Sequence, residues 1–176
     1  MRIAEWKKNL AVMWSTQFIG MSAITGMISF LPLYVTVLGV SDSSEVAMWS
    51  GILMGAASLC AAISNPYWGA MADRKGRKPM VEKVLLMYGF IIISMAFVSN
   101  VYQLLTLRVL QGFCGGFVAA GTALVLSSTP PEEISFTVGM FQTSIIIGGA
   151  VGPMLGGLIA DTFGYRHPFV VFGVIC

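Results

Sequence analysis

The stretch NLAVMWSTQFIGMSAITGMISFLPLYVTVLGVS, from Asn9 to Ser41, contains no charged residue. It is longer than the roughly 20 residues with which an α-helix crosses the hydrocarbon core of a bilayer. A secretory signal peptide is the alternative interpretation, but its apolar segment is shorter and ends in a small-residue cleavage site, which this stretch lacks. We therefore predict that a first membrane-spanning helix occupies most of this stretch.

The composition of the whole chain extends this interpretation to its other apolar stretches. Hydrophobic residues make up 56% of the chain and charged residues only 10%, whereas soluble domains contain about 25% charged residues. The polar pair Ser99 and Asn100 divides an apolar stretch that is too long for one crossing. The predicted spans are 9–38, 46–71, 80–98, 101–127 and 134–160, followed by an incomplete sixth at 167–176. The expected fold class is an all-α integral membrane protein.

The basic residues indicate how the chain is oriented in the membrane. If the N-terminus is cytoplasmic, eight Lys and Arg residues fall on the cytoplasmic side: Arg2, Lys7, Lys8, Arg74, Lys75, Arg77, Lys78 and Lys83. Only Arg166 falls in an outer loop. Under the positive-inside rule, this distribution predicts a multi-pass protein of the cell membrane with a cytoplasmic N-terminus.

Two predicted loops share a pattern of residues. After the second span and again after the fifth, similar residues recur with an offset of 88 positions: Gly69, Ala72, Asp73, Gly76 and Lys78 match Gly157, Ala160, Asp161, Gly164 and Arg166. Coincidence between two helix-ending turns is the alternative. Three predicted spans separate the copies, so one copy lies on each side of the membrane, as in the inverted repeats of many secondary transporters.

The stretch GAMADRKGRKP, Gly69 to Pro79, forms the first cytoplasmic loop. The positive-inside rule alone would explain its basic residues, but it does not predict two glycines around an Asp-Arg pair. The stretch resembles the loop signature of the major facilitator superfamily. The resemblance implies that the loop is a gating latch, which closes against the second half of the transporter. The matching residues are Gly69, Asp73, Arg74, Gly76, Arg77 and Lys78.

The fourth predicted span contains LTLRVLQGFCGG, in which Arg108, Gln111 and Gly112 lie on one helix face. An arginine inside a span costs at least about 2.5 to 3.5 kcal/mol on insertion scales, so it should face a cavity or a partner. Snorkelling to the outer surface is the alternative. The pattern resembles a motif of the same superfamily, and the resemblance implies a role in proton coupling. Away from the span ends no Asp, Glu or His occurs, so a proton-carrying carboxylate is not found in this half.

The fifth predicted span contains GGAVGPMLGG, with glycines at every fourth position. Glycines at this spacing allow two helices to approach closely, and an internal proline bends a helix. Plain helix packing is the alternative interpretation. The pattern resembles the antiporter signature of the drug/proton branch of the superfamily, which favours efflux over uptake. The matching residues are Gly148, Gly152, Pro153, Gly156 and Gly157.

The end of the first span, Phe30 to Val40, is similar to bacterial multidrug exporters of the superfamily. These usually carry a proline where Ser29 stands, and only Pro32 remains here. The whole resemblance implies the N-terminal six-helix lobe, built from two inverted three-helix repeats with the sixth helix incomplete. Apolar side chains would line a substrate cavity between two lobes. Candidates from this half are Phe18, Met27, Phe30, Met54 and Phe113.

The motifs together predict proton-coupled efflux of drug-like small molecules by alternating access. The expected partners are the substrate, protons, the lipid bilayer and a second six-helix half. The alternatives are a truncated inactive or accessory membrane fragment, and a sugar or metabolite transporter of the same superfamily. No cofactor or metal is expected, and an enzyme is disfavoured because the spans lack paired carboxylates and catalytic Ser/His sets. A net charge of +2, with the basic residues mostly in loops, argues against a nucleic-acid surface.

Overall fold

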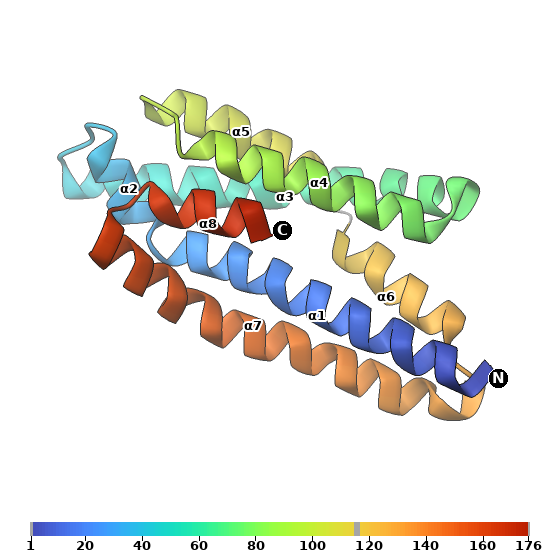
Figure 1. The fold of residues 1–176 in the computed structure, drawn as a ribbon. Helices are drawn as coiled ribbons and strands as arrows, with labels where there is room; N and C mark the ends of the chain where they lie inside the picture. The colour runs from blue at the N-terminus through green and yellow to red at the C-terminus, as the bar shows by residue number, and fades with distance from the viewer. Residues whose placement is uncertain (1, 115–116, 176) are drawn as a thin grey trace.

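The computed structural model describes the backbone of residues 2–114 and 117–175, and their side chains except those of 2–5, 73, 75, 77, 78, 81 and 117–120. The described residues form eight α-helices and one 3-10 turn (Figure 1). The elements are α1 (Arg2–Ser29), α2 (Leu31–Val37), α3 (Ser43–Lys75), α4 (Arg77–Met95), α5 (Val101–Phe113), α6 (Phe117–Ser128), η1 (Pro131–Glu133), α7 (Ile134–Phe163) and α8 (His167–Ile175). No described residue belongs to a β-strand, and the prediction of an all-α fold is confirmed.

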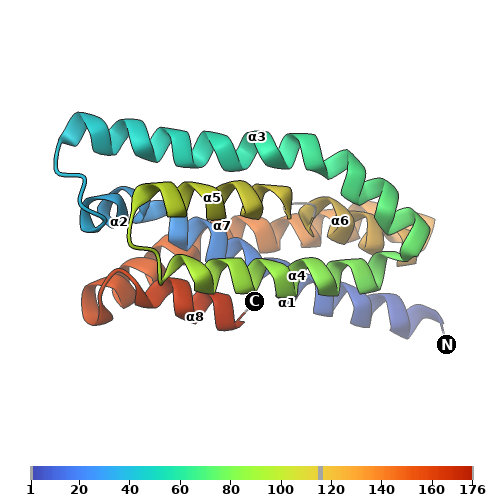
Figure 2. The ribbon, with the colours of Figure 1, turned by 90° about the horizontal axis from the view of Figure 1, so that it is seen from above.

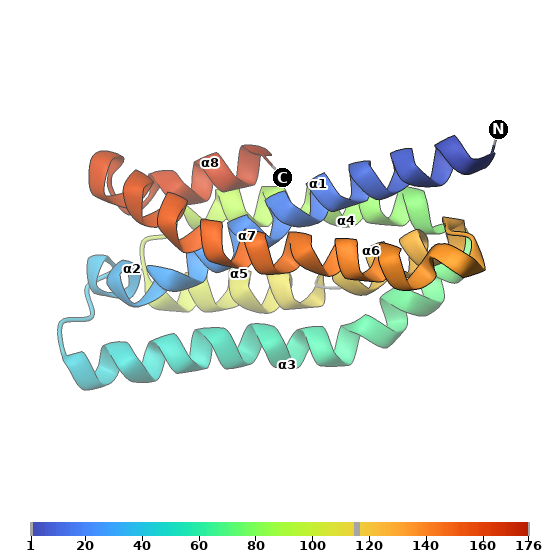
Figure 3. The same ribbon diagram turned by 90° about the horizontal axis from the view of Figure 1, so that it is seen from below.

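The helices run roughly along one direction and form an elongated bundle (Figure 1). α1 packs along α7, α3 packs along α5, and α4 contacts α8. In the view of Figure 2, α3 lies on the opposite face of the bundle from α8. The same separation is seen from the other side in Figure 3. The bundle is therefore built from helix pairs that lie side by side.

The first predicted span is divided into α1 and α2 at Phe30, whose φ and ψ are −107° and 11°. Pro32 lies in the first turn of α2 and cannot donate a backbone hydrogen bond to the turn before it. Ser29 continues α1 to its end, and its hydroxyl donates to the carbonyl oxygen of Thr25 (2.9 Å). The break therefore lies directly N-terminal to the remaining proline.

The two copies of the sequence repeat have the same backbone conformation at their glycines. Gly76 ends α3 with φ 94° and ψ 135°, and Gly164 ends α7 with φ 93° and ψ 161°. Residues with a Cβ rarely adopt such positive φ values, which explains glycine at both positions. Because α3 and α7 run in opposite directions, the two turns lie at opposite ends of the bundle (Figure 1). The prediction of two inverted repeats is confirmed.

Two clusters of buried apolar side chains fill the space between the helices. The larger cluster contains side chains from each of the helices α1 through α5 and from α8. It includes Met27, Tyr34, Leu53, Met95, Leu104 and Phe169. The smaller cluster consists of Met13, Val84, Val125 and Phe141. The hydroxyl of Tyr34 donates to the carbonyl oxygen of Met95 (2.8 Å), which satisfies a polar atom inside the larger cluster.

Large apolar side chains also cover the outside of the bundle. Leu86, Phe90 and Phe97 are each more than 70% exposed. Water-soluble proteins rarely expose such extended apolar surface, whereas lipid solvates it well. Among the described residues, three helical segments are long and apolar enough to cross a bilayer: Trp6–Ser29, Ser43–Ala72 and Pro131–Phe163. The structure therefore supports a membrane protein, and the limits of the individual crossings stay predictions.

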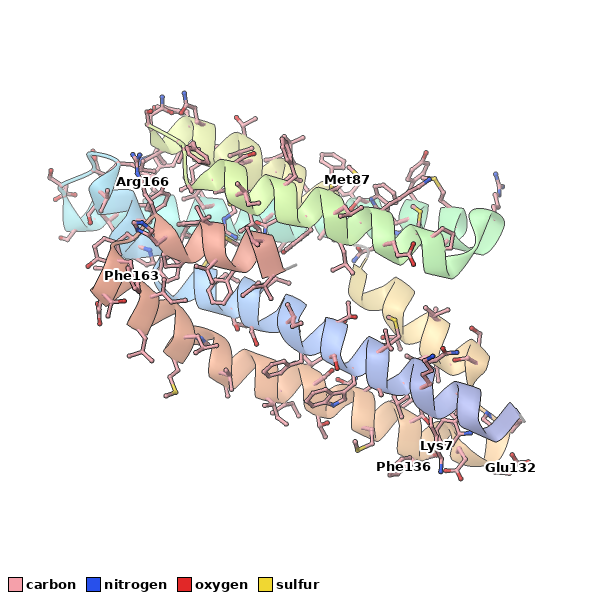
Figure 4. The ribbon with its side chains drawn as sticks, viewed as in Figure 1. Lys7, Met87, Glu132, Phe136, Phe163 and Arg166 are labelled. Carbon is pink, nitrogen blue, oxygen red and sulfur yellow. The ribbon has the colours of Figure 1, made fainter. Side chains whose placement is uncertain are left out.

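Charged side chains mark the two ends of the bundle. Lys7 and Glu132 lie at one end, together with Phe136 (Figure 4). Arg166 lies at the opposite end, near Phe163 (Figure 4), and its Nη2 donates to the carbonyl oxygen of Val98 (3.3 Å). This placement is the one expected where a chain leaves lipid for water.

Replacing Gly164 by alanine should destabilise the protein by about 1 to 3 kcal/mol, because a Cβ is unfavourable at the positive φ of this turn. The thermal unfolding midpoint of the detergent-solubilised protein measures the effect. Gly139→Ala is the matched control, because no described atom lies within 4 Å of a Cβ added at this helical position of α7. If both substitutions lowered the midpoint equally, the conformation of Gly164 would not be the cause.

Candidate functional site

The candidate site is centred on Arg108 in α5. The buried residues of α5 are Val101, Leu104, Arg108, Gln111 and Gly112. Their spacing places them on one face of the helix, which is turned toward the inside of the bundle. The Arg108 side chain is only 3% exposed. It therefore lies inside the bundle and does not snorkel to the outer surface.

Two hydrogen bonds connect Arg108 to α4. The Nη1 atom of Arg108 donates to Oε1 of Gln111 (3.1 Å), and Nε2 of Gln111 donates to the hydroxyl oxygen of Tyr88 (2.8 Å). The Gln111 amide uses its acceptor toward the guanidinium and its donor toward the phenol, so its neighbours fix its orientation. Tyr88 was not among the residues predicted from the sequence. Its only signal is a hydroxyl group in an apolar stretch, which does not reveal the side of the helix on which it lies.

A cavity of about 230 Å³ lies beside Arg108, between α1, α3, α4 and α5. Ile24, Ile28 and Met54 belong to its apolar lining, and Ser58, Tyr88 and Arg108 to its polar lining. The Nε and Nη2 atoms of Arg108 have no hydrogen-bond partner among the described residues. Arg108 thus contributes a buried and only partly paired guanidinium to the wall of this cavity.

The other apolar candidates from the sequence lie elsewhere. Met27 and Phe30 are buried in the larger apolar cluster. Phe18 stacks on Trp14, with 5.6 Å between the ring centroids. Phe113 is 46% exposed. Of the five candidates, Met54 is the one that belongs to the lining of the cavity beside Arg108.

Gly112 brings α5 into contact with the backbone of α3. A Cβ added at Gly112 would lie 2.3 Å from the carbonyl oxygen of Ala57 and 2.8 Å from Cβ of Cys60. The Ser64 hydroxyl donates to the carbonyl oxygen of Gly112 (3.2 Å). The indole N–H of Trp68 donates to the carbonyl oxygen of Phe113. The structure thus places Gly112 in the packing that holds α3 next to the cavity.

The glycines of the fifth-span motif fall into two groups. Gly148, Gly152 and Gly156 face α1, and a Cβ at Gly152 would lie 2.4 Å from the carbonyl oxygen of Ser22. Gly157 faces away, since no described atom lies within 4 Å of a Cβ added there. Pro153 lies inside α7, which continues through it to Phe163. Three of the five motif residues therefore form the contact with α1.

The loop motif lies at the end of the bundle and apart from Arg108. α3 extends to Lys75, so Gly69 and Arg74 are helical, and the turn itself is at Gly76. Arg74 is exposed, and it lines a separate surface pocket with Tyr67, Ala70 and Met71. The side chains of Asp73, Arg77 and Lys78, which the sequence assigns to the latch, lie outside the described residues.

The sequence that folds into this bundle matches a known protein family. The chain belongs to the Major Facilitator Superfamily, which it matches over residues 13–176. It is similar to the multidrug resistance protein MdtG of Escherichia coli strains O1:K1 / APEC, K12 / DH10B and SMS-3-5. In each case 41% of 166 aligned residues are identical, and the alignment covers 94% of this chain. It covers 41% of each relative, so the chain spans about two fifths of their length.

Replacing Gly152 by alanine should destabilise the protein by about 1 to 3 kcal/mol, because the new Cβ forces α7 away from the backbone of α1. Thermal unfolding in detergent measures the loss. Gly157→Ala is the control from the same motif, and it should leave the unfolding midpoint nearly unchanged. A similar loss in both variants would show that the contact between α1 and α7 is not what the glycines provide.

Proposed function

We propose that this chain forms the N-terminal lobe of a proton-driven exporter of drug-like small molecules, which works by alternating access in the cell membrane. The observation that carries the proposal is the hydrogen-bond chain that runs from the buried Arg108 through Gln111 to the half-buried Tyr88, beside a cavity. The similarity to proteins named for multidrug resistance supports export as the direction of transport.

A buried guanidinium is costly in a lipid-solvated bundle, so its retention favours a function over a packing role. In the proposed mechanism, Arg108 binds an acceptor group in one state of the transporter and releases it in another. Gln111 orients the guanidinium through its side-chain oxygen, 3.1 Å away, and Gly112 keeps α3 close enough to form a wall of the cavity. Coupling to protons then arises when protonation of the acceptor weakens its binding to Arg108.

Alternating access requires that the lobe moves as one body. The backbone contacts of α1 with α7 and of α3 with α5 give this stiffness. We assign the glycines Gly148, Gly152 and Gly156 to it, with Pro153 and Gly157 completing the antiporter motif. The loop motif, Gly69, Asp73, Arg74, Gly76, Arg77 and Lys78, is proposed as the cytoplasmic latch against a second lobe.

Replacing Arg108 by alanine in the full-length transporter should lower proton-driven efflux about tenfold or more, because hydrogen bonds to charged groups contribute about 1.5 to 3 kcal/mol. The measurement is retention of a fluorescent dye in cells, before and after a protonophore collapses the gradient. Thr106→Ala is the control: this exposed hydroxyl of α5 donates back to the carbonyl oxygen of Tyr102. If the protonophore left dye retention of the unmodified transporter unchanged, proton-driven export would be excluded.

The orientation of the lobe can be tested with single cysteines in a cysteine-free background. Both Ser44 and Glu132 are exposed. Ser44 lies in the first turn of α3, before its apolar stretch, and Glu132 lies in η1, just before α7. With a cytoplasmic N-terminus, a membrane-impermeant maleimide should label Ser44→Cys in intact cells and Glu132→Cys only after permeabilisation. The reverse pattern would show that the N-terminus faces outward.

A further inference from the structure

The guanidinium of Arg108 belongs to a side chain that lines the cavity, and part of it is buried without a hydrogen-bond partner among the described residues. Its Nη1 atom is bonded to Gln111, whereas Nε and Nη2 have no partner among the described residues. The N–H groups on Nε and Nη2 lie on the same edge of the planar group and point in parallel directions. This fork matches the two oxygens of a carboxylate or a similar oxyanion. What the buried arginine lacks is therefore an anionic acceptor.

No acidic residue of this chain can supply that acceptor at the depth of Arg108. The stretches Val46–Ala72, Val84–Leu107, Val109–Pro131 and Ile134–Ala160 contain no Asp or Glu, and the same holds for Asn9–Ser41. Arg108 thus leaves one positive charge inside this half without an opposite charge from the chain. An unpaired buried charge attracts an anion and repels a cation.

The lining of the cavity combines polar and apolar side chains. The polar part of the lining includes Arg108, Gln111 and Ser58, and the apolar part includes Ile24, Ile28 and Met54. Ser58 donates its hydroxyl hydrogen to the carbonyl oxygen of Met54 (3.0 Å), and its oxygen can still accept hydrogen bonds. A small apolar body with an oxyanion head matches both parts.

We propose that this cavity binds the anionic head group of an amphipathic substrate, with Arg108 as its direct ligand, so that the transporter prefers organic anions over organic cations. The proposal rests on the proposed transport function and names the substrate class for the same site. The substrate carboxylate accepts from Nε and Nη2, while Gln111 holds Nη1 in place. The apolar body lies against Ile24, Ile28 and Met54.

The test measures binding to the purified full-length transporter in detergent, without a proton gradient. Three probes of nearly the same shape differ in charge: 1-naphthaleneacetate, its neutral amide and 1-naphthylmethylammonium. The acetate should bind about tenfold or more tightly than the amide, and the ammonium most weakly. Equal affinities of acetate and amide, or no binding of either probe, would overturn the proposal.

Arg108→Gln should remove the preference for the acetate and change the affinity for the amide by less than about twofold. Binding of the amide therefore shows that the variant is folded. If the variant weakened both probes equally, Arg108 would pair with a carboxylate from the rest of the full-length protein or support the fold, and the proposal would fail. Arg108→Lys should keep part of the preference, because its ammonium retains the charge but not the fork.

Gln111→Glu is a second variant that does not depend on removing the arginine. Its carboxylate can accept from Nη1 of Arg108 and from the hydroxyl of Tyr88, since a phenol either donates or accepts. The added negative charge should abolish the preference for the acetate and improve binding of the ammonium. Retention of the acetate preference would contradict the proposal. Thr106→Ala, on the same helix, should bind all three probes as the unmodified protein does.

The binding measurements and the transport experiment test two different proposals, and either proposal can be wrong while the other stands. If the protonophore has no effect on dye retention but the acetate preference depends on Arg108, proton-driven export is wrong and the anion site stands. If export depends on the proton gradient but acetate and amide bind equally, export stands and the anion site is wrong.

Discussion

Close contact between helix backbones is the constraint on which the rest of this structure depends. In a bundle solvated by lipid, burying apolar side chains between helices gains little, because lipid tails are as apolar as the side chains. Helices then associate through tight packing and through hydrogen bonds between them. At Gly152 and Gly112 the neighbouring helix comes so close that even a Cβ would collide with backbone carbonyl oxygens. These two contacts position α1 and α3, which form two walls of the cavity beside Arg108.

The fold could be predicted from the sequence because its strongest signals are local. Charge-free stretches longer than a bilayer crossing indicated helices, and the matched turns at Gly76 and Gly164 indicated an inverted repeat. Both expectations agree with the described helices. The break at Phe30 was less predictable in position, because a proline acts on the turn that precedes it. The helices can extend beyond the predicted crossings: α3 continues to Lys75, whereas the predicted crossing ends at residue 71, and this limit stays a prediction.

The candidate site was only partly predictable. Arg108 and Gln111 stood out because polar residues are rare in such spans, and the structure joins them by a hydrogen bond. Tyr88 was missed because it belongs to another helix, and a uniformly apolar helix gives no periodic pattern from which its rotation can be read. For the same reason, Met27 and Phe30 were indistinguishable from Met54 in the sequence, although two are buried in the core and one lines the cavity.

The glycine turns at Gly76 and Gly164 have a mechanical consequence. They have nearly the same φ, end antiparallel helices, and sit at opposite extremes of the bundle. If a lobe tilts about an axis at the bilayer midplane, its two ends move in opposite directions. Under the proposed alternating-access mechanism, one turn would move toward the facing lobe while its counterpart moves away. The same backbone geometry would thus serve each compartment in alternation, which gives duplicated turns a purpose beyond ending their helices.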